Sequence, residues 1–481
     1  MTSPTLPDGL VAVVKRDCHT CVLIAPILAE LADSGADLAV YTQDDPAFPS
    51  QVPGVIDDTD LDVSYHHDIE TVPSLLRVKN GSETGRIVGW SRDQWREFTG
   101  VEDLAADAET DFSPGCGSLS VDPSMTALLA VRFGGSSLAS RRVELAMLED
   151  EMEAMFDRDW SDGLPLVPPT QRRVMAMLDG TEREPSDIVA TVPPDLTEAS
   201  VEKVAINAVM AGARPEYFPV ILTALEAVCT DEFNMHGLLA TTYFSGPVVV
   251  VNGPIAKAIG MNSGGNCLGQ GNRANMTIGR ALQLVVRNIG GGRPGGVDRS
   301  AFGSPGKLSF CFAEDEDGSP WEPLSVERGL APGTSAVTVF AGHGPSAIVD
   351  QLSRQPESLV ASMASVMVKT GNPKLLRGFD ASLVIGPEHS RIFREAGWDK
   401  ARVKAELGEH LTLNTDAMLR GVDGIDEGLP AALAGQRLPK FGKGMPLIIH
   451  AGGGAGMFSA IIEGWVGGPM GSIPVTREVR P

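Results

Sequence analysis

Cysteine is scarce in this chain, with only six residues spread over 481 positions. Disulfide-held scaffolds are short chains dense in cysteine, so the sequence does not belong to that class. Such sparse cysteine usage is typical of a reduced compartment. We therefore expect a cytoplasmic protein.

Positive charge is also in short supply. The chain has 39 Lys and Arg residues against 62 Asp and Glu residues, a net charge of −23. Nucleic-acid binding requires a basic surface, so we expect no nucleic-acid partner. An anionic membrane surface would repel the chain as well.

Long apolar runs are missing. The longest, such as "GPVVVVNGPIAKAIG", are far shorter than a membrane span. The N-terminus, "MTSPTLPDGLVAVVK", has neither a basic region nor a long apolar region, so we expect no signal peptide. No membrane association is predicted.

Metal-binding motifs are not evident either. The eight histidines form no H-E-x-x-H motif, and no second C-x-x-C accompanies the first. We therefore predict no metal site from local motifs, which leaves open a site with ligands distant in sequence. No cofactor is predicted other than a redox-active disulfide.

The hydrophobic content of 43% is ample for buried cores, and the length predicts two or three domains. Short apolar strands alternate with longer helical patterns, which predicts an α/β fold.

The clearest local signal is "LVAVVKRDCHTCVLIAPILAELADSG". Its apolar β-rich start predicts a buried strand, and the spacing after the cysteines predicts a helix that ends near Gly35. Cys18 then lies at a helix N-terminus, where unpaired N–H groups stabilise a thiolate. His19 lowers the pKa of that thiol further when it is protonated.

This stretch resembles thioredoxin, through Cys18, Cys21 and the "IAPIL" that contains Pro26. "TVPSLLRVKNGSE" is similar to the thioredoxin strand that opens with a cis-proline, here Pro73. The resemblance implies a thioredoxin-like domain over residues 1–108 and a catalytic C-x-x-C pair. The usual Trp-Cys-Gly-Pro-Cys is replaced by Arg16-Asp17-Cys18-His19-Thr20-Cys21, so the family's rates and redox potential do not carry over.

Residues 109–160 have the composition of a connector with a charged helix over 137–160. Cys116 lies between Gly115 and Gly117 in its flexible part. A thiol there is either a mobile redox partner or an incidental loop cysteine.

We expect residues 161–481 to form a large α/β substrate domain. A weak internal sequence similarity suggests two similar lobes, at 195–300 and 335–465. It relates "VVVVNGPIAKAIG" to "SLVIGPEHSRIFREAGW", and the alternative is that the similarity arose by chance. A substrate site between lobes suits the general preference for clefts.

Within this domain, "NSGGNCLGQGNRANMTIGRAL" combines glycines and asparagines directly before a predicted helix. Such a loop directs backbone N–H groups at an anion, and Asn262, Asn266, Arg273 and Asn275 are the predicted ligands. A second arginine, Arg280, can provide a further contact to the anion. The alternative is a tight irregular turn with no ligand.

Further candidates follow apolar strands. They are Trp321 and Glu322 in an acidic loop, Glu388 and His389 at a helix start, and His450 before a glycine loop. Carboxylates beside a Trp are candidates for acid–base work, and histidines at strand ends for bases or ligands. Cys267 and Cys311 are the candidate thiols of this domain; Cys311 lies on a predicted strand.

The large domain resembles the UGSC-type (seleno)proteins, through "DGLPLVPPT", "GNRANMTIGRA", "PGKLSFCFAEDED" and other segments between 160 and 478. The family's Sec/Cys-Gly-Ser-Cys corresponds to Cys116-Gly117-Ser118, with Leu119 in place of the last cysteine. The second thiol of that motif is therefore missing.

These features predict a thiol-dependent redox enzyme. Its thioredoxin-like C-x-x-C domain is expected to exchange electrons with the fused large domain, which acts on a small anionic sulfur- or selenium-containing compound. A thiol reductant or reductase is its expected partner, and a homo-oligomer is left open. The alternatives are a lyase or hydrolase that uses Glu, His and Cys of the large domain, and a non-enzymatic redox sensor or binding protein.

Overall fold

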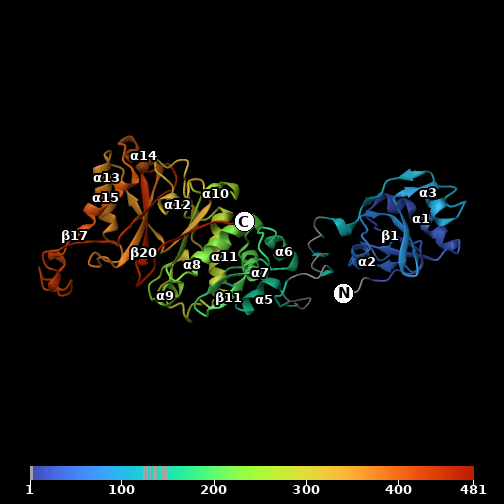
Figure 1. The fold of residues 1–481 in the computed structure, drawn as a ribbon, viewed down its shortest axis with the longest axis horizontal. Helices are drawn as coiled ribbons and strands as arrows, with labels where there is room; N and C mark the ends of the chain where they lie inside the picture. Colours follow the sequence, from blue (N-terminus) through green and yellow to red (C-terminus); the bar gives the residue numbers. More distant parts are fainter. Residues whose placement is uncertain are drawn as a thin grey trace. The chain divides into compact units, whose positions relative to one another are not determined.

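The computed structural model describes residues 4–480 except 123, 124, 126, 127, 130, 131, 134–137, 142, 144 and 146–149. The chain is of the α/β class and forms two compact units, Met1–Leu138 (unit 1) and Ala139–Pro481 (unit 2). Figure 1 shows unit 1 in blue to cyan and unit 2 in green to red.

Unit 1 is built on one five-stranded sheet. Its order is β3 (Ile56–Asp57), β2 (Leu38–Thr42), β1 (Gly9–Val14), β5 (Ser74–Lys79) and β6 (Ser82–Val88). Strand β1 runs parallel to β2 and antiparallel to β5. The β5–β6 hairpin turns at Asn80 and Gly81, whose φ angles of 54° and 70° suit a tight turn.

Three helices accompany this sheet: α1 (His19–Asp33), α2 (Asp62–His66) and α3 (Arg92–Thr99). Helix α1 contains Pro26 and buries Cys21, Ile24, Leu28 and Leu31, three or four positions apart. This spacing fixes one face of α1 against the sheet, and with it the position of Cys18 at the helix start.

Residues 109–138 belong to unit 1 and not to a separate connector. Strand β8 (Phe112–Ser113) pairs with β7 (Trp90–Ser91), and β9 (Cys116–Gly117) pairs with β4 (Thr71–Val72). A short 3-10 helix, Leu119–Val121, follows. Part of the predicted charged helix over 137–160 lies outside the described residues; α5 (Glu151–Asp157) falls within its range.

Unit 2 contains two four-stranded sheets. The first has the order β13 (Cys311–Ala313), β12 (Gly246–Asn252), β14 (Ala336–Gly342) and β21 (Val475–Glu478). The second has the order β15 (Pro345–Val349), β20 (Phe458–Val466), β16 (Phe379–Ile385) and β19 (Leu447–His450). Alternate residues of facing strands, such as Val248 and Val384, meet in one apolar core between the sheets.

Helices cover the outer face of each sheet (Figure 1). On the first sheet these are α8 (Phe218–Val228) and α11 (Arg273–Asn288), and α7 (Val201–Ala211) packs against both helices. On the second they are α13 (Pro356–Met367), α14 (Pro387–Glu395) and α15 (Lys400–His410). Unit 2 is therefore layered as helices, sheet, sheet, helices.

The remaining elements of unit 2 are shorter. They are α6 (Gln171–Leu178), β10 (Ile188–Val192), β11 (Thr197–Ser200), α9 (Met235–Ala240), α10 (Pro254–Ala258), α12 (Leu324–Glu327), β17 (Thr412–Asn414) and β18 (Arg437–Pro439). The two-lobe repeat stays a prediction, because β14, from the second predicted lobe, pairs with β12 of the first.

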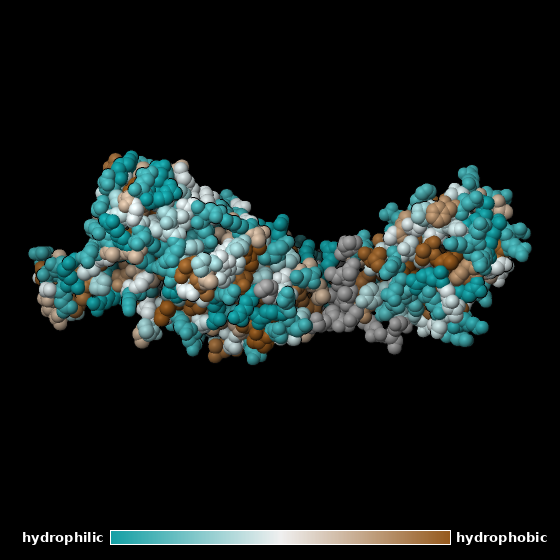
Figure 2. Space-filling view, turned by 45° about the horizontal axis from the view of Figure 1, so that its top comes forward, coloured by the Kyte–Doolittle hydropathy of each residue, from teal (hydrophilic) through white to brown (hydrophobic). Residues whose placement is uncertain are grey.

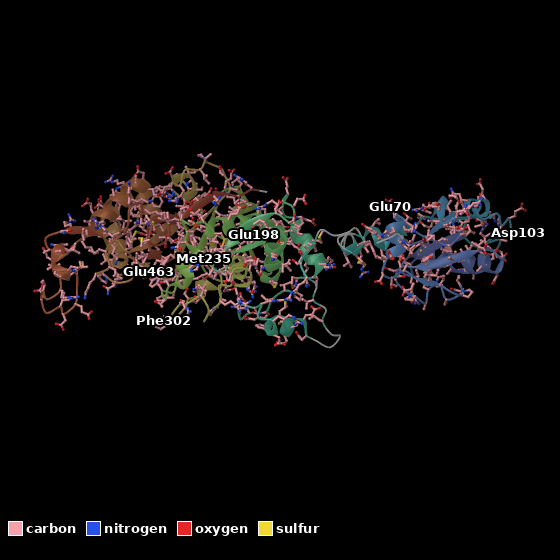
Figure 3. All side chains as sticks on the ribbon, turned by 60° about the horizontal axis from the view of Figure 1, so that its bottom comes forward. Glu70, Asp103, Glu198, Met235, Phe302 and Glu463 are labelled. Atoms are coloured by element: carbon pink, nitrogen blue, oxygen red, sulfur yellow. The ribbon has the colours of Figure 1, made fainter. Side chains whose placement is uncertain are left out.

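The surface reflects the acidic composition. Figure 2 shows mostly hydrophilic residues on the visible face, with scattered apolar areas. Isolated side chains such as Phe302, Leu352 and Met470 are about nine-tenths exposed, at 89%, 89% and 90%; Phe302 is labelled in Figure 3. Among the residues described, no helix has the length and apolar content to cross a membrane.

Candidate functional site

The first candidate site lies at the N-terminus of α1. Cys18 is the N-cap of this helix, and its Sγ accepts a hydrogen bond from the Cys21 amide at 3.3 Å. The preceding turn is fixed because the amides of Arg16 and Asp17 donate to the Asp44 carboxylate at 2.7 and 2.8 Å. The sequence prediction of a cysteine at the helix start is confirmed.

The two thiols of the pair are in different electrostatic states. A hydrogen bond from the Cys21 thiol, followed by one from Cys116, lowers the pKa of Cys18 to about 5. Burial, followed by the same bond to Cys18, raises the pKa of Cys21. Cys18 is 4% exposed and Cys21 is fully buried. Cys18 is therefore the thiolate of the pair at neutral pH.

Cys116 lies at this pair. Its strand β9 is antiparallel to β4, with Cys116 opposite Val72 and Gly117 opposite Thr71. The Val72 carbonyl is 3.6 Å from Cys18 Sγ, and the Val72–Pro73 peptide is cis, as predicted for Pro73. The hydrogen bond that Cys116 donates to Cys18 raises the pKa of Cys116, which stays a thiol. Three thiol groups thus meet at one point.

Several contacts hold residues 112–121 (the 112–121 segment) in place. Thr20 Oγ1 donates to the Pro114 carbonyl at 2.5 Å, and the Ser118 amide donates to the Glu70 carbonyl at 2.9 Å; Glu70 is labelled in Figure 3. The buried side chain of Gln43 donates to Ser118 Oγ at 2.6 Å. The prediction of a freely swinging Cys116 is therefore wrong.

Gly115 permits this close packing. A Cβ atom at Gly115 would lie 2.3 Å from Thr71 Cγ2 and 3.0 Å from the Val72 carbonyl oxygen. At Gly117 a Cβ atom would meet nothing within 4 Å. The glycine before Cys116 is thus a packing requirement, which the sequence suggested only as flexibility.

In unit 2, the Gly/Asn loop uses its amide side chains internally. Asn275 Oδ1 accepts from the Asn262 amide at 3.0 Å, and Asn275 Nδ2 donates to the Asn262 carbonyl at 2.8 Å. Asn266 Nδ2 donates to the Gln270 carbonyl at 2.6 Å. The cap of α11 is Asn272, whose side chain accepts from the Asn275 amide. These asparagines build a tight turn, which was the alternative interpretation.

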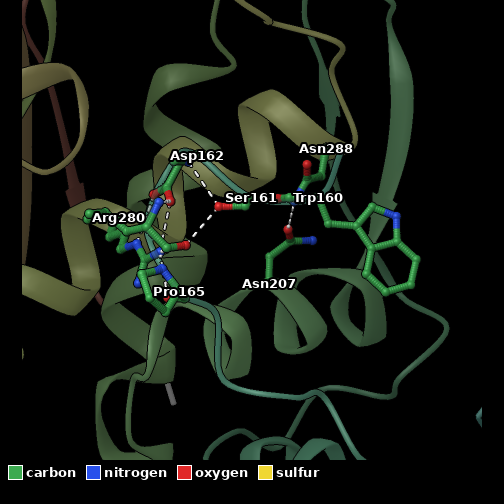
Figure 4. Close-up of polar contacts among 9 residues, drawn as sticks. Trp160, Ser161, Asp162, Pro165, Asn207, Arg280 and Asn288 are labelled. Atoms are coloured by element: carbon green, nitrogen blue, oxygen red, sulfur yellow. Dashed lines mark hydrogen bonds and ion pairs between the residues drawn. The ribbon is translucent and has the colours of Figure 1, made fainter. Parts of the chain in front are cut away.

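The two arginines of this region are also occupied. Arg273 is exposed, and its Nε donates to the Gly212 carbonyl at 2.9 Å. Arg280 forms a two-point pair with Asp162, with both N···O distances at 2.8 Å (Figure 4). Arg280 therefore anchors the 161–165 segment on α11 and is not free to hold a ligand. The predicted anion clamp gains no support from these contacts.

A second cluster forms where strands of both sheets end. Glu314, directly after β13, is buried, and its carboxylate accepts from Asn252 Nδ2 and the Leu324 amide, both at 2.7 Å. Burial raises the pKa of Glu314. The His450 amide lies 3.4 Å from Glu314 Oε1, and the His450 carbonyl accepts from the Asp315 amide at 2.8 Å. Carboxyl ends of strands are a common place for ligand sites.

His450 connects two further side chains in this cluster. Its Nδ1 is 3.0 Å from the Asp315 carbonyl oxygen and 3.4 Å from Asp315 Oδ2, while its Nε2 is 3.0 Å from Ser390 Oγ. Burial lowers the pKa of His450, so the ring is neutral near pH 7. Because Nδ1 faces only acceptors, it carries the proton, which leaves Nε2 as an acceptor. The single Ser390 hydroxyl proton has two acceptors at 3.0 Å, His450 Nε2 and the Pro387 carbonyl oxygen.

The glycine loops approach this cluster. The Gly452 amide donates to the Ser263 carbonyl at 2.8 Å, so the loop after His450 contacts the Gly/Asn loop. Glu388 accepts from the Met457 amide at 2.5 Å. His389 is fully buried, with its ring nitrogens 2.8 Å from Ser459 Oγ and 3.1 Å from the Asp350 carbonyl oxygen. Glu388 and His389 therefore hold the loop after β19.

Two further predicted site residues of unit 2, Trp321 and Glu322, take part in packing and in backbone contacts. Trp321 is 9% exposed, belongs to the core of the second sheet and donates from Nε1 to the Trp398 carbonyl at 2.9 Å. The Glu322 side chain is exposed, while its carbonyl accepts from Lys400 Nζ at 3.0 Å. Among the described residues, neither side chain is hydrogen-bonded to the Glu314–His450 cluster, so their predicted role in substrate binding gains no support.

The cysteines of unit 2 are buried. Cys267 is 4% exposed, and burial raises its pKa to about 11. Cys311 is 5% exposed, lies on β13 close to Gly279 of α11, and has its pKa raised by burial. Protonated, buried thiols are poor nucleophiles, so the predicted role of these two as site thiols is not supported.

Within the described ranges, no group of three His, Cys, Asp or Glu side chains is arranged to hold a metal ion. The sequence did not point to Asn252, Asp315 or Ser390. Asn252 ends β12 and Asp315 closely follows β13, so their positions after apolar strands were an available signal, whereas Ser390 lies within α14 and had none.

Comparison with known proteins gives no assignment: the chain matches no protein-family model and no curated protein.

Proposed function

We propose that the protein is a thiol–disulfide oxidoreductase with three cooperating thiols in a thioredoxin-like unit 1. The observation that carries the proposal is the position of Cys116, opposite Val72 and hydrogen-bonded to Cys18. The strand–Cys18–helix junction and the cis peptide before Pro73 support it.

The exchange follows from the protonation states. The Cys18 thiolate attacks a substrate disulfide, forms a mixed disulfide and releases one substrate thiolate. The Cys21 or Cys116 thiol then loses its proton and attacks Cys18 Sγ, which releases the second substrate thiolate. The enzyme is left with one disulfide, and an external dithiol reduces it while being oxidised itself.

The substrate proposed for this chemistry is a small sulfur or selenium compound. The closed position of the 112–121 segment supports a small substrate, because that segment already pairs with the backbone edge at Val72. An extended protein substrate would have to displace it.

The test is a set of cysteine variants assayed for disulfide reduction with a dithiol regenerated by an NADPH-coupled reductase. Cys18→Ser should abolish turnover, whereas Cys311→Ser should not change it. Cys21→Ser should accumulate a Cys18–Cys116 disulfide on mild oxidation, seen by non-reducing peptide mapping. Full activity in Cys18→Ser would refute the proposal, and absence of turnover in the wild type with a retained reversible disulfide would favour a redox sensor.

A second candidate is a hydrolase site in unit 2, favoured by the Ser390–His450–Asp315 alignment. A hydroxyl that donates to a neutral histidine, itself oriented by an acceptor on its other nitrogen, is the arrangement that activates a serine nucleophile. Ser390 is 3% exposed, so a substrate would need the adjacent glycine loop to open.

A fluorophosphonate probe tests this candidate directly. The full-length protein should be labelled at Ser390, and His450→Gln should abolish labelling while Cys18→Ser should not. Wild-type protein that stays unlabelled under conditions that label a control serine hydrolase would rule the candidate out.

A further inference from the structure

A cavity lies between the two sheets of unit 2. It is lined by residues of β14, β16 and β20 and of the segments before β19 and β21: Phe340, Ala341, Asp380, Ala381, Ser382, Met445, Trp465, Ser472 and Pro474. Asp380 and Ser382 are on the face of β16 that carries Val384, which packs against the first sheet. The cavity is separate from the cluster around His450, because it lies at the opposite end of β16.

Three polar groups in this cavity are left without protein partners. The hydroxyls of Ser382 and Ser472 are buried, at 0% and 4% exposure, and neither forms a hydrogen bond with the described residues. The Asp380 side chain is half-buried. Its carboxyl forms no hydrogen bond or ion pair in the described part of the chain, and partial burial raises its pKa to about 6. Buried polar groups without partners are costly, so their concentration in one cavity points to a ligand.

Asp380 is also held close to the backbone. A Cβ atom at Gly467 would lie 2.1 Å from Asp380 Oδ2, and one at Gly442 would lie 3.5 Å from Oδ1. The carboxyl therefore lies against glycine on one side and faces the cavity without a cation of the protein beside it.

We propose that this cavity binds the protonated amino group of ammonium or of a small primary amine. Such a group has three N–H donors and one positive charge, which match the two hydroxyl acceptors and the carboxylate. Trp465 and Phe340 also line the cavity, and aromatic side chains beside a cation favour its binding. The space admits a group about the size of one water molecule.

Other ligands fit the cavity less well. Water supplies hydrogen bonds but leaves the carboxylate charge uncompensated. An anion is repelled by Asp380. A divalent metal ion needs more anionic oxygen ligands than one carboxylate and two hydroxyls provide.

The experiment is isothermal titration of the full-length protein at pH 8 with ammonium chloride and with methylammonium chloride, at constant ionic strength. Sodium chloride and tetramethylammonium chloride, which lacks N–H donors, are the control salts. Binding of ammonium alone identifies the free ion as the ligand, whereas binding of both identifies a small amine site. Asp380→Asn should weaken binding by about tenfold or more, as expected for loss of a charge-assisted hydrogen bond.

Ser382→Ala should weaken binding less, and Glu395→Gln, at an exposed carboxyl on α14, should leave it unchanged. Equal heats for ammonium and sodium in the wild type, or unchanged ammonium binding in a folded Asp380→Asn variant, would overturn the proposal and leave a water site. As a second measurement, Asp380→Asn in ammonium-free buffer should melt at a higher temperature than the wild type. The reason is that Asp380→Asn removes a half-buried carboxylate charge that no cation of the described residues compensates. A lower melting temperature together with no ammonium effect would count against it.

Discussion

Cys116 stands opposite Val72 in an antiparallel pair, and the carbonyl of the same Val72 lies 3.6 Å from Cys18 Sγ. One short backbone pairing thus brings a thiol from a distant part of the chain to the helix N-terminus. The hydrogen bond from Cys116 to Cys18 is a direct consequence of this register.

Alkylation tests the acidity that this arrangement gives Cys18. Its pKa is lowered to about 5, so iodoacetamide should label Cys18 with a pH midpoint near 5, long before Cys21 reacts. Cys116→Ala removes one hydrogen-bond donor to Cys18, so the midpoint should move upward, and Cys229→Ala is the matched control. Quantitative mass spectrometry of the labelled peptides gives the rates. Slow and equal labelling of Cys18 and Cys21 would show that no thiolate is present.

The stability of unit 1 should depend on pH through the same thiol. The folded pKa of Cys18 is about 5, below the value of about 8.5 for a thiol in an unfolded chain. Between these values the unfolded state binds more protons, so the free energy of unfolding rises with pH. The stabilisation is complete above the unfolded value and is lost as the pH falls through about 5. Urea unfolding of reduced protein at several pH values should show this slope, and Cys18→Ser should flatten it.

A substitution at Gly115 tests whether the 112–121 segment shields Cys18. Gly115→Val places side-chain atoms against Thr71 and the Val72 carbonyl, so the segment should detach and Cys18 should be alkylated faster at pH 8. Gly117→Ala is the matched control, because its Cβ meets nothing within 4 Å. Equal labelling rates in both variants would mean that the segment does not limit access.

Lys440 provides a test of unit 2. The residue is fully buried, and its Nζ donates to the carbonyls of Thr370, Asn372 and Leu375 at 2.8, 2.7 and 2.9 Å. Lys440→Met leaves three carbonyls without this donor and should lower the free energy of unfolding by about 2–4 kcal/mol. The exposed Lys443→Met is the control and should change stability by less than about 0.5 kcal/mol. Denaturant unfolding of both variants measures the difference.

Short-range sequence patterns were sufficient to predict the part of the thiol site that contains Cys18, Cys21 and Pro73. The apolar run before Cys18, the helical spacing after it and the X-Pro pair at Val72–Pro73 are all short-range signals, and the structure has each of them. Cys116 was misjudged because its glycine neighbours suggest flexibility, while its partner strand lies more than forty positions earlier. Periodicity carries no information about such a pairing.

In unit 2 the sequence predicted the region where polar site residues gather better than it predicted the role of each residue. Glu388, His389 and His450 do meet near the ends of β16 and β19, but His389 has both ring nitrogens engaged by protein atoms. Trp321 beside acidic residues suggested a binding loop, yet its ring packs in a core and its N–H is used by Trp398. Burial depends on which elements pack together, and the composition of one loop does not determine it.

The pairing of β14 with a strand much later in the chain has a consequence for the folding of the chain during its synthesis. Thr338 of β14 is beside Thr476 of β21, which lies 138 positions later in the chain. While a ribosome makes the whole second sheet, the edge of β14 has no partner strand and presents free backbone groups. We therefore expect a chain released before residue 475 to be more prone to aggregation than the full-length chain, because the edge of β14 stays unpaired.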